Sequence, residues 1–102
     1  MSTVRGMVKS RAEAQAVHNE LVGKLINKTR SRGNMSHEAY FRLTPPGTPE
    51  SLEFFAVDVW MDAAGMQEHY TDPEFLGGFG KLFAGEPATG VWTHPAGEWV
   101  EW

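Results

Sequence analysis

The chain contains no cysteine. Disulfide bonds, thiolate nucleophiles, cysteine-ligated zinc and iron–sulfur clusters are therefore all excluded. Long hydrophobic runs are also missing: no segment approaches the ~18 consecutive apolar residues of a membrane-spanning helix. The first residues, MSTVRGMVK, lack the apolar stretch of a secretion signal. We therefore expect a soluble, cytoplasmic protein with no membrane partner.

Basic residues are scarce as well. Nine lysine and arginine residues stand against thirteen aspartate and glutamate residues, which gives a formal net charge of −4. The densest basic group lies near the end of a predicted helix, where positive charge complements the helix dipole. Nucleic-acid binding needs a continuous basic face, so we predict no nucleic-acid partner. The basic group consists of Lys24, Lys28, Arg30 and Arg32.

Capping residues mark the ends of two predicted helical regions. The first begins with a capping box and ends at a glycine; the second begins at an aspartate, restarts at an Asp-Pro pair and ends at a glycine. These residues are Ser10, Glu13 and Gly33 for the first region, and Asp62, Asp72, Pro73 and Gly85 for the second. Period-two alternation predicts strands near residues 3–9, 35–43, 52–60 and 89–94.

The resulting order, βαββαβ, is that of the ferredoxin-like α+β fold, a four-stranded antiparallel sheet with two helices on one face. At 102 residues the chain is predicted to form one domain over residues 1–102, with residues 95–102 as a C-terminal arm. Trp99 and Trp102 are expected to anchor this arm on the core or on a partner subunit. Two further expectations concern glycines: Gly23 would contact a helix, and the glycines of segment 76–80 would let their helix approach the sheet.

The second and third predicted strands should pair as an antiparallel hairpin in one particular register. Placing Arg42 opposite Glu53 joins opposite charges, and the same register puts apolar residues opposite apolar residues. A slip by one residue would turn every side chain to the other face. The remaining pairs in this register are Leu43–Leu52, Phe41–Phe54, Ala39–Ala56 and His37–Asp58.

Both faces of this hairpin carry large apolar side chains. An antiparallel sheet with one face in water alternates between apolar and polar residues, and this hairpin does not. We therefore predict that a second copy of the chain covers the face opposite the helices, so that a homodimer closes a two-chain barrel. The apolar residues of that face are Tyr40, Phe55, Val57 and Val59.

A pocket is predicted between the helices and the sheet. Large aromatic residues with a few polar groups suit a flat, apolar ligand. His37 and Asp58 form a candidate titratable pair, because a neighbouring carboxylate favours the charged imidazole and fixes its tautomer. A satisfied polar pair without a catalytic role is the alternative. His18 lies beside the apolar stripe of the first helix, where it either lines the pocket or faces solvent.

Residues 54–83 carry a more specific pattern. A strand ends in Trp60, His69 follows nine residues later on a capped helix, and Pro73 and Phe75 come soon after. This segment resembles the helix signature of the antibiotic-biosynthesis-monooxygenase family of dimeric α+β barrels. The resemblance implies a homodimer and a cofactor-independent oxygenase that acts on a small aromatic or quinol-type molecule, without metal or flavin.

The resemblance also implies roles for individual residues. Trp60 would stack on the substrate, and His69 would act as acid, base or orienting donor. The alternatives are a core position that closes the strand end for Trp60, and for His69 a structural role, bonded to a backbone carbonyl or lying at the dimer seam. The match is partial, because Ala56 and Met66 stand where the family's oxygenases carry asparagine and tyrosine. Phe79 stands where haem-degrading relatives carry the axial histidine, which disfavours haem.

The sequence thus predicts a monooxygenase-like enzyme, with two alternatives: a non-catalytic small-molecule binder, or a structural barrel with a filled core. The resemblance implies no cofactor, and no metal is predicted, since no histidine pair has the spacing of a metal motif. The candidate catalytic residues are His69, His37 and Asp58, and the candidate substrate-binding residues are Trp60, Ala56, Met66, Phe79 and His18.

Overall fold

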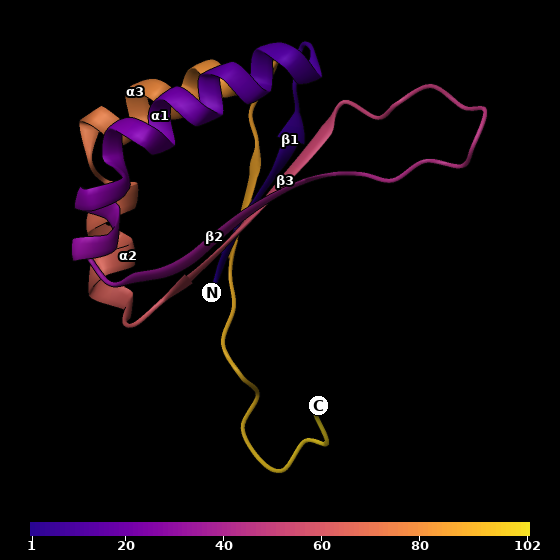
Figure 1. The fold of residues 1–102 in the computed structure, drawn as a ribbon. Helices are drawn as coiled ribbons and strands as arrows, with labels where there is room; N and C mark the ends of the chain where they lie inside the picture. The colour runs from indigo at the N-terminus through magenta and orange to yellow at the C-terminus, as the bar shows by residue number, and fades with distance from the viewer.

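The computed structural model describes all residues, 1–102, and confirms the ferredoxin-like α+β fold. Its sheet has four antiparallel strands in the order β2-β3-β1-β4. All three helices lie on one side of this sheet (Figure 1). The elements are β1 Ser2–Met7, α1 Arg11–Ser31, β2 Asn34–Phe41, β3 Glu53–Trp60, α2 Ala63–Tyr70, α3 Pro73–Leu82 and β4 Ala88–Val91.

The helix starts follow the predicted caps. Ser10 Oγ accepts a hydrogen bond from the Glu13 backbone N–H at 3.0 Å, and Asp62 caps α2 in the same way through the N–H of Gly65. Asp72 caps α3 and places Pro73 in its first turn. Gly33, with a φ of +95°, takes the left-handed conformation that ends α1 and turns the chain into β2.

Two element ends differ most from the sequence prediction. Helix α3 ends at Leu82, three residues before Gly85, because Phe83 is extended and its side chain enters the core. Strand β4 ends at Val91 rather than His94, because Val91 already lies opposite Ser2, the first residue of its partner β1, and the chain then leaves the sheet.

The predicted hairpin register is confirmed: Phe41 pairs with Phe54, Ala39 with Ala56, and His37 with Asp58. Beyond the strand ends, the Arg42 guanidinium lies 2.5 Å from the Glu53 carboxylate. A bulge between Asn34 and Ser36 accommodates one extra residue at the start of β2. The hairpin widens into a loop after Arg42, and Leu43 is 95% exposed there rather than paired.

The core lies between the helices and the sheet. Aromatic rings form a continuous row from α3 into this core: Phe75, Phe79 and Phe83 follow one another at centroid distances of 5.1 and 5.3 Å, and Phe83 meets Phe54 at 5.9 Å. Aromatic packing of this kind supplies much of the buried apolar area. The fully buried part of the core consists of Val4, Val8, Ala14, Phe54, Ala56, Leu82 and Phe83.

The neighbours of the glycines differ from those expected from the sequence. A Cβ at Gly23 would meet nothing within 4 Å, so no helix contact explains this residue. Gly78 lies against Leu21, so the glycine-rich part of α3 approaches α1 rather than the sheet. The closest approach is at Gly65, where an added Cβ would lie 1.7 Å from the Arg32 carbonyl oxygen. Gly65 therefore fixes how closely α2 packs on the end of α1.

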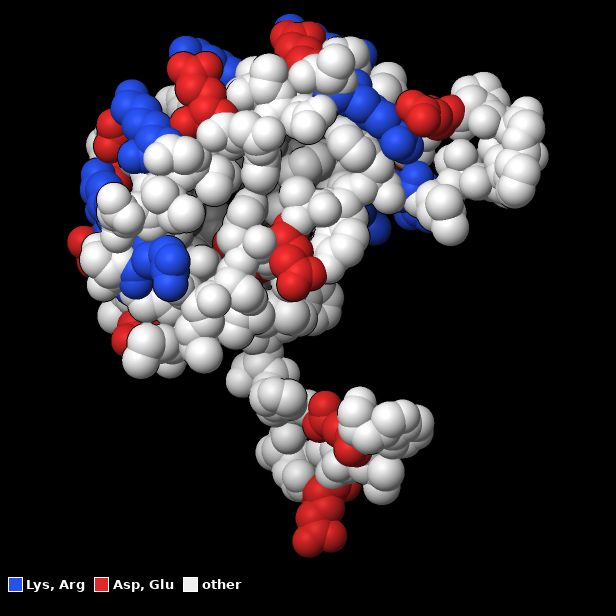
Figure 2. All heavy atoms as spheres, viewed as in Figure 1, with Lys and Arg blue, Asp and Glu red and all other residues white.

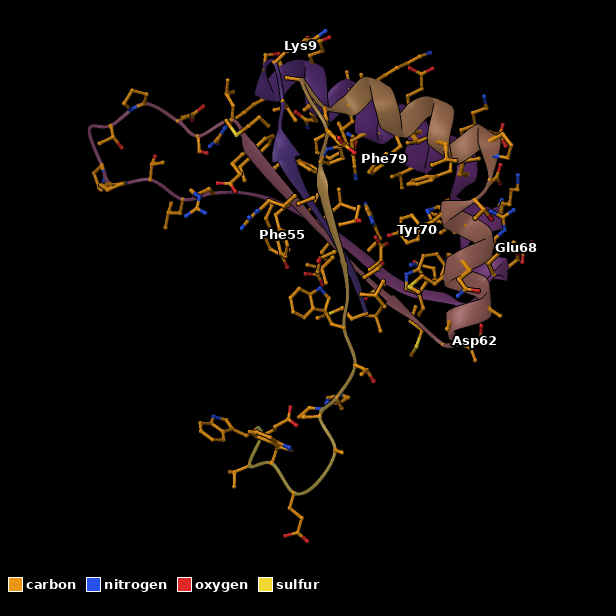
Figure 3. All side chains as sticks on the ribbon, turned by 180° about the vertical axis from the view of Figure 1, so that it is seen from behind. Lys9, Phe55, Asp62, Glu68, Tyr70 and Phe79 are labelled. Carbon is orange, nitrogen blue, oxygen red and sulfur yellow. The ribbon has the colours of Figure 1, made fainter.

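The opposite face of the sheet and the C-terminal arm are open. Figure 3 shows the Phe55 side chain on the side of the sheet away from the helices, and Tyr40 and Val59 on that face are exposed. Residues 95–102 extend away from the domain (Figures 1 and 2). Trp99 and Trp102 are exposed, so the arm is not anchored on its own core. No helix combines the length and apolarity needed to cross a membrane.

Asp72 ties the end of α1 to the start of α3. Its carboxylate lies 2.6 Å from Lys28 Nζ and 2.9 Å from the Arg32 guanidinium, and it also accepts the N–H of Glu74. The hydrogen bond from Lys28, with those from Glu74 and Arg32, holds the pKa of Asp72 well below its ordinary value of 3.8. The carboxylate therefore stabilises the fold only while it is ionised.

We expect Asp72→Asn to lower the melting temperature by several degrees near neutral pH and to flatten its acid dependence. Asparagine keeps the capping oxygen and removes only the charge. Because the folded-state pKa is depressed, the stabilisation is present above about pH 4 and is lost as the pH falls through the folded-state pKa. Thermal unfolding across this range checks the prediction, with Asp62→Asn as the matched cap that has no cationic partner. Parallel acid profiles for Asp72→Asn and the wild type would contradict it.

Candidate functional site

A cavity of about 440 Å³ lies between the helices and the sheet. Most of its lining is apolar. Helix α1 contributes Leu21, Val22, Leu25 and Ile26, and helix α3 contributes Phe75, Phe79 and Leu82. Tyr70 and Phe79 both point from their helices toward the sheet (Figure 3). The polar and titratable lining residues are His18, Thr29, Arg30, Asn34, Ser36, His37, Asp58, His69 and Tyr70.

Asp58 is the centre of a hydrogen-bonded group in the sheet wall of this cavity. His37 Nδ1 lies 2.9 Å from Asp58 Oδ1, as the strand register predicted. Asn34 donates to the same oxygen at 3.2 Å, and the Tyr70 hydroxyl donates to Asp58 Oδ2 at 3.4 Å. These donors compensate the burial of the carboxylate, which would otherwise be costly.

The histidine of α1 joins this group. His18 Nε2 lies 2.7 Å from His37 Nε2, and His18 Nδ1 lies 2.9 Å from the Asn19 side-chain oxygen. Both nitrogens of His37 are therefore occupied, one by Asp58 and the other by His18. His37 cannot bind a ligand through a ring nitrogen unless one of these hydrogen bonds opens.

His69 has the opposite character. Its side chain is 6% exposed, and its buried Nδ1 has no hydrogen-bond partner. Its ring lies against Phe75 at a centroid distance of 4.0 Å and against Trp60 at 5.2 Å. Burial lowers the pKa of His69 from its ordinary value, and the nearby Asp58 carboxylate opposes this only in part. The cavity thus contains a neutral imidazole with unused hydrogen-bonding capacity.

Tyr70 is held as a neutral phenol. Burial raises its pKa to about 12, against a weaker opposing effect of the hydrogen bond with Ser2. The Ser2 hydroxyl lies 2.8 Å from the Tyr70 hydroxyl and accepts the indole N–H of Trp60 at 3.0 Å. A directed chain of donors therefore runs from Trp60 through Ser2 and Tyr70 to Asp58.

Six of the eight candidate site residues named from the sequence line the cavity: His18, His37, Ala56, Asp58, His69 and Phe79. Trp60 and Met66 are buried but do not belong to the lining. Trp60 lies behind His69 and Tyr70, because its indole N–H reaches Ser2 on the neighbouring strand. A substrate stacked on Trp60, as the resemblance implied, would have to displace those two rings.

The sequence analysis missed three residues of the hydrogen-bonded group around Asp58: Asn34 and Tyr70, which line the cavity, and Ser2, which lies behind them. Tyr70 is one residue beyond His69 on a short helix, and no periodicity distinguishes it. Asn34 follows the helix-ending Gly33, where asparagine is ordinary turn chemistry. Ser2 sits near the N-terminus, and only its pairing with Asp58 across β1 and β3 brings it to the site.

The side chains offer little for a metal or a charged cofactor. No group of three or more histidine, aspartate or glutamate residues is arranged to hold a metal ion. The Nε2 atoms of His18 and His37 lie close together, but Asp58 bonds to His37 Nδ1 and to neither Nε2 atom. The arrangement instead suits an uncharged aromatic molecule with a hydroxyl group, since apolar walls surround a few polar atoms.

Comparison with known proteins gives structural relatives only. No protein-family model matches the chain, and no curated protein sequence matches it. Similar solved structures include Rv0793 from Mycobacterium tuberculosis, with 22% identity over 95% of this chain and 94% of that one and a TM-score of 0.60. A structure described as an antibiotic biosynthesis monooxygenase has 15% identity over 92% and 97% of the two chains and a TM-score of 0.60. PA3566 from Pseudomonas aeruginosa has 18% identity over 93% of each chain and a TM-score of 0.57. The fold implied by the sequence resemblance is therefore confirmed.

Proposed function

We propose that this chain is an oxygenase of the antibiotic-biosynthesis-monooxygenase type, which oxidises a small phenol- or quinol-type molecule in the cavity without metal or flavin. The fold shared with a solved protein of that description supports the proposal. A phenol with a free para position and O₂ gives a quinone and water. One oxygen atom enters the ring, the other leaves as water, and the substrate supplies all the electrons.

The observation that carries this proposal is the unpartnered His69. A buried polar atom without a hydrogen-bond partner is costly, and a ligand hydroxyl that paired with His69 Nδ1 would remove that cost. A ligand hydroxyl would donate its proton to the neutral imidazole, which favours the phenolate that reacts with O₂. Trp60 supports the His69 ring from behind, and the His37–Asp58 pair lies in the facing wall.

Oxygen uptake with a panel of quinols and phenols tests the proposal. We expect wild-type protein to consume O₂ with at least one member of the panel, and His37→Ala to be slower. Native mass spectrometry of the purified chain identifies any aromatic molecule that copurifies and guides the choice of panel. A panel matched to that molecule with no O₂ consumption would overturn the oxygenase proposal.

A second candidate is a non-catalytic binder of the same class of molecule. The closed hydrogen-bonding of His37 favours it, because this leaves only His69 free to handle a proton. Binding of phenols without O₂ consumption would identify this function.

We also propose that two copies of the chain pair through the open face of the sheet. Exposed Tyr40 and Val59 and the half-buried Phe55 and Val57 support this, because contiguous exposed apolar surface usually marks an interaction site. The C-terminal arm would reach the partner, since its two exposed tryptophans contact nothing in the core of their own chain. Figure 2 shows acidic atoms but no Lys or Arg atoms on this arm, so the contact would bury its tryptophans and leave Glu98 and Glu101 in solvent.

We expect the wild type to sediment as a dimer at micromolar concentration, at twice the chain mass of 11.4 kDa, and Val57→Lys to sediment as a monomer. A lysine on the covered face would bury an unpaired charge, which costs several kcal/mol, on the order of 3–5. Leu43→Lys is the matched control, because Leu43 lies on the exposed hairpin loop. A monomeric wild type, or a dimer that tolerates Val57→Lys, would remove this interface.

A further inference from the structure

The contact between His18 and His37 has the geometry of a shared proton. The nitrogen–nitrogen distance is 2.7 Å, whereas the ring centroids are 5.0 Å apart and the ring planes differ by only 16°. The rings therefore meet edge to edge, close to one plane, and do not stack face to face. Only one proton fits between two nitrogens at this distance, because two facing N–H groups would repel each other.

The outer nitrogens indicate how many protons the pair holds in this arrangement. His37 Nδ1 faces a carboxylate oxygen of Asp58, and His18 Nδ1 faces the carbonyl oxygen of the Asn19 amide. With the Asn19 amide in this orientation both partners are acceptors, and each of these nitrogens would carry a hydrogen. Three hydrogens on four nitrogens are one more than two neutral imidazoles hold. This arrangement therefore corresponds to a pair with one positive charge, which the Asp58 carboxylate balances.

We propose that His18 is a positioning residue that shares one proton with His37, so that the Asp58–His37–His18 triad stores a single proton at zero net charge beside the cavity. The proton exchanges with solvent at His18 Nδ1, because Asn19 is exposed and His18 is only half-buried. If the Asn19 amide turned by 180°, its NH₂ group would face His18 Nδ1 and would donate a hydrogen bond to it after the proton has left the triad.

The surroundings favour a single proton. Tyr70 donates to Asp58 from α2, Asn34 donates from β2, and neutral His69 adds no charge. Arg30 is the only other charged side chain in the cavity wall, and α3 contributes only apolar side chains. A second proton on the pair would therefore have no counter-charge apart from Asp58, and the two rings would have to separate.

The stored proton deepens the proposed function, on which its role in catalysis rests. It specifies that the ligand enters the cavity uncharged. A neutral triad admits an uncharged phenol, whereas an uncompensated Asp58 would oppose the phenolate that forms. The triad therefore has to keep its proton while the substrate ionises, because loss of the proton through His18 would leave Asp58 uncompensated beside the phenolate.

Imidazole NMR of the full-length chain over a range of pH tests the proposal independently of turnover. We expect His18 and His37 to respond together to the uptake of about one proton, with one strongly downfield-shifted hydrogen for the shared bond. His18→Gln should abolish this signal and let His37 titrate alone. His94→Gln is the matched control, because His94 lies just before the arm with its side chain 88% exposed, and its replacement should change nothing at the site.

Three outcomes would overturn the proposal. The two wild-type rings could titrate independently, the downfield signal could survive in His18→Gln, or stoichiometric Zn²⁺ could bind both Nε2 atoms in place of the shared proton. The last would identify a metal site instead. Amide spectra show whether His18→Gln remains folded, and His18→Asn provides a second variant if it does not. In oxygen uptake, we expect His18→Gln to shift the pH profile. We expect it to lower kcat by less than the ~10²-fold typical of a lost general base. If no O₂ is consumed, the oxygenase proposal fails, whereas the shared-proton proposal is unaffected.

Discussion

Replacement of His69 by phenylalanine is expected to abolish oxygen uptake and to leave the fold at least as stable as the wild type. The substitution keeps an aromatic ring against Phe75 and Trp60 and removes only the two nitrogens. Loss of a general base lowers kcat by roughly 10²- to 10⁴-fold. Loss of a buried unpaired nitrogen removes a penalty of about 1 kcal/mol or more, so the free energy of unfolding should not fall.

The pH dependence of stability gives His69→Phe a second readout. The folded-state pKa of His69 is depressed by burial, below an ordinary value of 6.5, so the unfolded chain binds the proton more readily. Wild-type stability therefore rises with pH through the window below 6.5 and falls on acidification, and the variant should lack this component. Urea unfolding near neutral pH and at mildly acidic pH measures both effects. Full oxygen uptake by the variant, with the same substrates as the wild type, would remove His69 from the reaction.

Gly65→Ala is expected to cause the largest loss of stability among conservative substitutions in this chain. The added methyl group would lie 1.7 Å from the Arg32 carbonyl oxygen and 2.9 Å from the carbonyl carbon. The end of α1 cannot simply retreat, because Arg32 is ion-paired with Asp72 and the Gly33 carbonyl accepts the N–H of Met61. We expect a loss of at least about 3 kcal/mol, the upper part of the range for overpacked interiors.

Gly23→Ala provides the matched control, because it makes the same change inside a helix without any neighbour. A Cβ at Gly23 meets nothing within 4 Å, so the variant should gain about 1 kcal/mol from the helix propensity of alanine. Urea denaturation of both variants measures the two shifts. Shifts of the same sign would show that the close approach at Gly65 does not constrain the fold.

Much of the architecture could be read from local signals. The caps at Ser10, Asp62 and Asp72 are short-range interactions between a side chain and the backbone next to it, so residue type and spacing determine them. The hairpin register followed from period-two alternation, because a slip would expose one apolar set and bury polar groups. The His37–Asp58 pair followed from that register alone.

Other features of the site depend on contacts between distant segments. The sequence left two roles open for Trp60, a core position or stacking on a substrate; its hydrogen bond to Ser2, 58 residues away, places its ring behind His69. The contact of His18 with His37 depends on how α1 crosses the sheet, and helix periodicity gives only the side of the helix on which a residue lies. For the same reason the glycine pattern could not show which helical glycine has a close neighbour.

The sequence by itself determined the order of the elements, their caps, the hairpin register and the apolar character of both sheet faces, because each depends on neighbouring residues or on a period of two. The tertiary structure alone decided which polar groups meet. Helix-to-sheet packing brings His18, His37, Asp58 and Tyr70 into one wall and leaves His69 without a partner. Such meetings depend on ångström-scale distances between segments, which burial and periodicity constrain only loosely.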